Sequence, residues 1–149
     1  MHPFDIKAVL LAKHAQHVVL IHFPIALFII GVLFDFLAQW RRQRLLAAAA
    51  YYNLLVAATT TVPVVATGML AWQRELERQK LKGILLMHLV KGCVSSVLIC
   101  VVWFTHGTTR RKQEEVLPGY RLPITAVAVV MVVLTGHLGS FLSGVNGQG

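Results

Sequence analysis

The segment HVVLIHFPIALFIIGVLFDFLA, residues 17–38, decides the fold of this chain. It carries one acid, Asp35, and neither lysine nor arginine. An α-helix rises about 1.5 Å per residue, so the segment is long enough to cross a hydrocarbon layer about 30 Å thick. Residues 17–38 therefore predict a transmembrane helix.

Three further segments share this apolar character, at residues 47–72, 83–106 and 123–142. With the first they predict an all-α fold, an integral membrane four-helix bundle over residues 17–142. Residues 1–16 are predicted to form an interfacial amphipathic segment, and residues 143–149 a short tail. The loops are too short to hold a soluble catalytic domain, so we expect no enzymatic activity from the chain alone.

The composition supports the same interpretation. Hydrophobic residues make up 56% of the chain and charged residues 13%, against about 25% charged residues in soluble domains. The net charge of +8 arises from clusters that adjoin the apolar segments, such as Arg41, Arg42 and Arg44. Basic residues in this position meet lipid head groups. We therefore expect contact with membrane lipid and no nucleic-acid partner.

Four spans place both termini on the same side of the membrane, here named side A, with side B opposite. Lysine and arginine are equally numerous in the segments on the two sides, so the positive-inside rule does not decide the orientation. The basic clusters of side B, at residues 41–44 and 110–112, lie closer to helix ends, which favours side B as cytoplasmic. The prediction is a multi-pass protein of the cell inner membrane with both termini non-cytoplasmic.

Three histidines, His22, His88 and His137, lie inside the predicted spans. The topology brings all three to a similar depth near side A, and polar residues at such depth are functional candidates. Neutral imidazole is an axial ligand of haem and a ligand of copper or zinc, and helix bundles hold such groups between facing helices. The histidines therefore predict a shared haem or metal site, with hydrogen-bonded packing and a proton path as the alternatives.

The residues around these histidines favour a large flat group over a bare ion. Nearby glycines would let a porphyrin approach the backbone, although glycine spacing also serves helix packing. A lysine on the same side could pair with propionates or extend to the interface. We expect the cavity between spans one, three and four, with these cofactor-binding residues: His22, His88, His137, Gly92, Gly136, Gly139 and Lys91.

Other polar residues admit two interpretations each. His14 precedes the first span and His17 is its first residue; both are interpreted as solvated interfacial histidines, with a second site as the alternative. His106 lies near side B, where a second cofactor is conceivable, but side B offers it no obvious partner histidine. The nearest polar residues to Asp35 on side B would be Tyr51, Tyr52, Asn53 and His106. Asp35 is expected to contact a tyrosine or the arginines just beyond it in the chain, or to take part in proton uptake. No C-x-x-C-H motif is present, which excludes c-type haem attachment to this chain.

Two segments resemble each other inside the chain, VVATGML at residues 64–70 and VVLTGHL at residues 132–138. They end the second and fourth spans. One interpretation is a pair of related helical hairpins, with an axis along the membrane normal between them. The other is a chance similarity between apolar helices.

The motifs HFPIAL at residues 22–27, followed by Asp35, and TGHLG at residues 135–139 resemble those of a bacterial four-helix membrane family of unknown function. That family is similar in architecture to small b-type cytochrome and quinone-linked membrane subunits. The resemblance implies a haem-b-binding subunit that passes electrons between quinone, or a peripheral redox subunit, and a larger respiratory or photosynthetic complex. The alternative is a cofactor-free structural subunit of such a complex.

Overall fold

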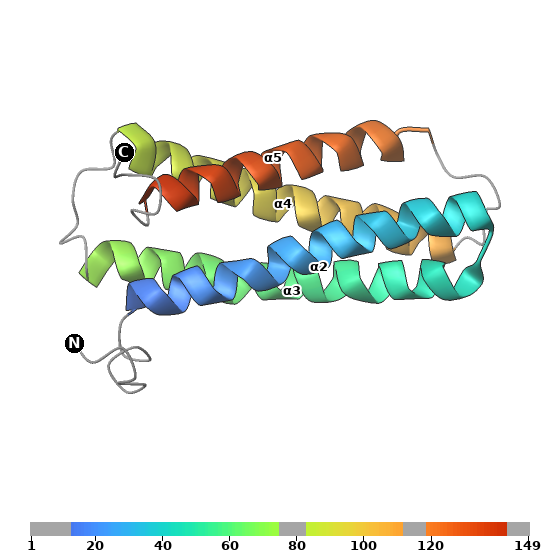
Figure 1. The fold of residues 1–149 in the computed structure, drawn as a ribbon, viewed down its shortest axis with the longest axis horizontal. Helices are drawn as coiled ribbons and strands as arrows, with labels where there is room; N and C mark the ends of the chain where they lie inside the picture. Colours follow the sequence, from blue (N-terminus) through green and yellow to red (C-terminus); the bar gives the residue numbers. More distant parts are fainter. Residues whose placement is uncertain (1–12, 75–82, 112–118, 143–149) are drawn as a thin grey trace.

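The computed structural model describes residues 13–74, 83–111 and 119–142, and these residues form four helices (Figure 1). Each helix is long and apolar enough to cross a membrane. This confirms the predicted all-α, four-helix membrane fold. The helices are α2 (Lys13–Arg41), α3 (Arg44–Arg74), α4 (Gly83–Arg111) and α5 (Arg121–Leu142).

The helices extend beyond most of the ends that hydropathy predicts, because helical hydrogen bonds continue into polar residues. Residues 13–16, predicted to belong to an interfacial segment, are the first turn of α2. The rest of that segment and the predicted tail at residues 143–149 lie outside the described residues. The start of α2 and the end of α5 lie at the same end of the bundle (Figure 1).

Successive helices run antiparallel and pack as two hairpins, α2 with α3 and α4 with α5 (Figure 1). The turn of the first hairpin is short because Arg42 adopts a left-handed conformation with φ of 51°. The Gln43 amide then donates to the Ala38 carbonyl at 3.1 Å, which satisfies a carbonyl at the helix end. Contacts between the hairpins are more extensive for α3 and α4 than for α2 and α5.

The core between the hairpins combines bulky and small side chains. Phe28 and Leu54 are completely or almost completely buried, and Ala57 and Ala128 allow the helices to approach closely. Many large apolar side chains point outward instead, including Phe104, which is 64% exposed. Such a surface belongs in hydrocarbon, because a soluble protein would bury most of these side chains.

The two hairpins bury residues at corresponding positions, which relates them by an approximate twofold axis. Asp35 and His106 are 71 residues apart and contact each other, and the same spacing relates the buried positions of α2 to those of α4. It also relates buried positions of α3 and α5. This register differs from the one suggested by the similar segments 64–70 and 132–138. The corresponding buried pairs are Pro24 and Ser95, Phe28 and Ile99, Gly31 and Val102, Ala38 and Thr109, Ala50 and Arg121, Ala57 and Ala128, and Thr61 and Val132.

Candidate functional site

A cavity of about 400 Å³ lies between the hairpins at the end where α2 begins and α5 ends. Its lining is mainly apolar with a few polar groups, which is the usual character of a ligand site. The sequence predicted a cavity between spans one, three and four, whereas α3 lines it as well, through Gly68, Met69 and Trp72 among others. The reason is that α2 and α3 pack closely, so the end of α3 lies beside the start of α2.

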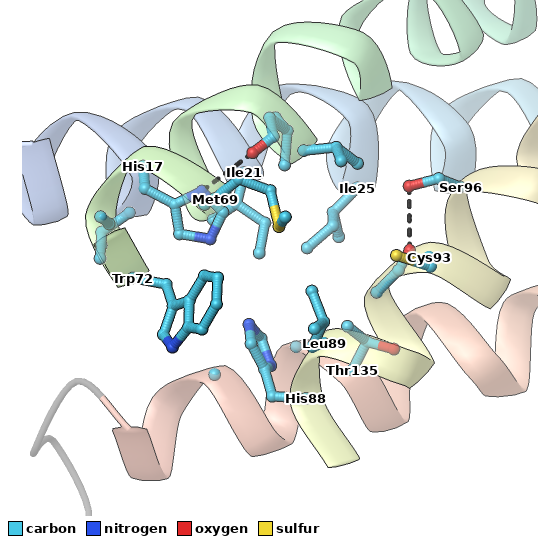
Figure 2. A pocket seen from close by; sticks show the side chains of 18 of the residues that line it. His17, Ile21, Ile25, Met69, Trp72, His88, Leu89, Cys93, Ser96 and Thr135 are labelled. Carbon is cyan, nitrogen blue, oxygen red and sulfur yellow. Dashed lines mark hydrogen bonds between the residues drawn. The ribbon is translucent and has the colours of Figure 1, made fainter. Parts of the chain in front are cut away.

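His17 enters the cavity from α2 (Figure 2). Its Nδ1 lies 3.1 Å from the Val64 carbonyl oxygen and 3.2 Å from the Thr67 hydroxyl. That hydroxyl itself donates to backbone carbonyls of α3, so Nδ1 is the donor in both contacts. In a neutral imidazole Nε2 is then the unprotonated nitrogen, and Figure 2 shows it on the side of the ring that faces His88.

His88 enters the same cavity from α4, opposite His17, and Trp72 lies beside both rings (Figure 2). Its Nδ1 is buried and has no hydrogen-bond partner among the described residues. His88 follows His17 by the same spacing of 71 residues that separates Asp35 from His106. The two imidazoles therefore hold corresponding positions in the two hairpins.

Each imidazole lies against a glycine of the other helix in its own hairpin. A Cβ atom built at Gly68 would lie 2.9 Å from His17 Cε1, and one built at Gly139 would lie 3.2 Å from His88 Cε1. These glycines are related by the same spacing as the histidines. Glycine at both positions thus makes room for a ring that points into the cavity.

The structure brings five of the predicted site residues to this cavity, and His22 is one of them. The His22 ring is exposed, and its Nδ1 donates to the Val18 carbonyl of its own helix at 2.6 Å. Neither Lys91 nor His137 is among the lining residues, and the His137 side chain is exposed. The other four predicted residues that line the cavity are His88, Gly92, Gly136 and Gly139.

Depth in the membrane follows from topology, but the direction of a side chain depends on helix rotation. One residue along a helix turns the side chain by about 100°, so His137 leaves the cavity although Gly136 lines it. Within the described residues, no group of three or more His, Cys, Asp or Glu side chains could hold a metal ion. The histidines that face each other are His17 and His88.

Sequence reasoning assigned His17 to the interface because it precedes the most apolar part of the first span. A signal for its role is present in the chain. His17 and Gly68 have the same separation as His88 and Gly139, and this repeated pair of residue types marks corresponding sites. Matching residues 64–70 with 132–138 implies a spacing of 68 residues, and at that spacing these two histidine–glycine pairs do not correspond.

A second group of polar residues lies toward side B. The Asp35 carboxylate accepts from His106 Nε2 at 2.8 Å and from Arg121 Nη2 at 2.9 Å. His106 was among the polar residues expected near Asp35, but the arginine that binds the carboxylate is Arg121 of α5 and not one just beyond Asp35 in the chain. This group ties α2 of one hairpin to α4 and α5 of the other.

Four apolar antiparallel helices that enclose a cavity of ligand size define a multi-pass membrane protein with an internal site. The chain belongs to the family described as predicted membrane protein (DUF2231), whose model matches residues 13–148. Neither a curated protein nor a solved structure matches the chain. The family description names no activity, so function has to be argued from the site.

Proposed function

We propose that this chain is a haem-b-binding membrane subunit in which His17 and His88 would hold the haem iron. It passes electrons between quinone, or a peripheral redox subunit, and a larger respiratory or photosynthetic complex. One observation carries the proposal: two imidazoles, one from each hairpin and at corresponding positions, face each other across one apolar cavity (Figure 2).

The residues present fit such a group in three respects. The bond from His17 Nδ1 to the Val64 carbonyl orients the ring, as a backbone carbonyl usually does for a metal-bound histidine. The cavity of about 400 Å³ falls within the range of roughly 300–1,000 Å³ found for small-molecule and cofactor sites. Glycines at positions 68 and 139 leave room for the two histidine rings to point into the cavity.

Haem supplies one-electron chemistry when it is bound, and the protein provides its ligands and its surroundings. His17 and His88 would hold the iron from opposite sides. Trp72, Ile21 and Leu89 give the cavity part of its apolar lining. The remaining surface of the bundle is apolar, so the electron would pass to partners at the membrane ends or within the bilayer.

The proposal is tested by spectroscopy on the chain purified gently from membranes with haem in adequate supply. We expect a b-type spectrum in the reduced-minus-oxidised difference and a positive pyridine haemochrome assay. A pure, folded chain without haem absorption would contradict the proposal. The cofactor-free structural subunit would then be favoured, because the His17 bond to Val64 also serves packing within a hairpin.

Replacing Gly68 by alanine is expected to remove most of the bound haem. The new methyl group would lie 2.9 Å from His17 Cε1, so the ring must turn away from the position that faces His88. Gly107→Ala is the control, because this glycine lies outside the cavity and its methyl group would make only an ordinary contact with Tyr51 Cε2 at 3.4 Å. The haem-to-protein ratio of the two purified variants measures the difference, and equal ratios would contradict the assigned position of His17.

A further inference from the structure

The group of Asp35, His106 and Arg121 lies in the interior of the bundle, at the opposite end from the cavity. His106 and Arg121 are 6% and 7% exposed. Asp35 is the only acidic residue in the described part of the chain. Because Asp35 and His106 hold corresponding positions and contact each other, they lie on the approximate twofold axis between the hairpins.

The hydrogen bonds assign the protons in this group. Arginine stays protonated in proteins, so the Arg121 cation balances the Asp35 carboxylate. His106 Nε2 faces Asp35 Oδ1 at 2.8 Å and therefore carries a proton. In the neutral ring Nδ1 is then a bare acceptor. This Nδ1 atom is buried and has no hydrogen-bond partner among the residues that the structure describes.

A purely structural contact does not account for this arrangement. To hold Asp35, only the Nε2 donor is needed, and an amide side chain could supply it. The imidazole adds a basic nitrogen that is left unsatisfied in the membrane interior, where such atoms destabilise the fold. Ionisable residues inside transmembrane segments face the bundle interior and mark proton relays among other sites.

The groups that surround His106 come from every helix packed around it. Asp35 reaches it from α2, and Arg121 binds the same carboxylate from α5. From α3, the Tyr51 ring lies with its centroid 6.2 Å from that of His106. The guanidinium of Arg110, one turn further along α4, stacks over Tyr51 at 5.0 Å. Arg110 is exposed, so the ring that packs on His106 lies beneath a surface cation of side B.

We infer that His106 is a proton-binding site of the membrane interior, reached from side B. The Nδ1 atom takes up one proton from water, and the Asp35 carboxylate stabilises the resulting imidazolium. The group of three changes from neutral to a charge of +1, and two cations then share one carboxylate at the junction of the hairpins. The inference is independent of haem binding, because the group and the cavity share no residue.

The direct test is nitrogen NMR of the chain with labelled histidine imidazoles in lipid nanodiscs. The His106 signals are identified by their loss in His106→Gln. We expect Nδ1 to change from unprotonated to protonated as the pH is lowered across the whole range in which the chain stays folded. An Nδ1 atom in one protonation state throughout would overturn the inference.

A second measurement compares the thermal unfolding of His106→Gln with that of the wild type in nanodiscs. The glutamine amide can still donate to Asp35 but cannot take up a proton, so the variant is expected to lose a pH dependence that the wild type shows. His137→Gln is the control, because it removes an exposed histidine outside the group and is expected to keep that dependence. An unchanged pH dependence in His106→Gln would overturn the inference.

Discussion

Replacing His88 by alanine is expected to lower the haem content of the purified chain by about tenfold or more, and replacing His17 is expected to do the same. Under the proposed function, each substitution removes one of the two histidines that would hold the haem iron between the hairpins. The alanine methyl group cannot bind iron, and no other histidine of the lining occupies the place of the imidazole that is removed. The haem-to-protein ratio and the reduced-minus-oxidised spectrum measure the effect.

Two other histidines serve as controls for this result. His137→Ala should leave haem content and spectrum unchanged, because His137 lies outside the cavity. His22→Ala should retain haem with a shifted spectrum, because the exposed His22 ring borders the cavity and bonds within its own helix. Loss of haem from His137→Ala, with normal content in His17→Ala, would contradict the assigned ligand pair.

Replacing Asp35 by asparagine is expected to destabilise the bundle by about 3–5 kcal/mol, the cost of leaving a buried cation without its partner. The Arg121 side chain is 8% exposed and donates to Asp35 at 2.9 Å. Without the carboxylate its charge remains at the junction of three helices in a medium of low dielectric constant. Equilibrium unfolding of the purified chain in mixed micelles measures the loss.

A second substitution in the same background shows whether the unpaired Arg121 charge causes the loss of stability. Arg121→Gln in the Asp35→Asn variant removes the unpaired cation, so the double variant should be more stable than the single one. If both unfold at the same denaturant concentration as the wild type, the ion pair does not hold the hairpins together. A lower stability of the double variant would point to packing by the Arg121 side chain instead.

The four helices could be predicted because lipid imposes a simple condition on the sequence. Every spanning segment has to be long and apolar, and segments 17–38, 47–72, 83–106 and 123–142 meet that condition. The same condition hides the orientation of each helix. Where residues are apolar on all sides, no amphipathic pattern shows which side chains face inward.

The sequence therefore predicted at which end of the bundle the cavity lies, but only some of the residues that line it. His88 was found because it is polar and lies well inside a span, and several glycines of the cavity were found with it. His17 was misplaced because hydropathy assigns residues near a helix end to the interface. Asp35 and His106 were recognised as unusual, since charge inside a span is rare, but their contact requires the packing of α2 against the second hairpin.

The twofold relation between the hairpins has a consequence for how a planar group sits between His17 and His88. A half turn about the axis exchanges the two histidines, so a bound haem would have two orientational isomers that compete for the cavity. Their ratio depends on the lining residues that differ between corresponding positions. Met69 corresponds to Ser140, and His22 corresponds to Cys93. These pairs, a thioether against a hydroxyl and an imidazole against a thiol, are among the differences that would distinguish the two orientations of a bound haem.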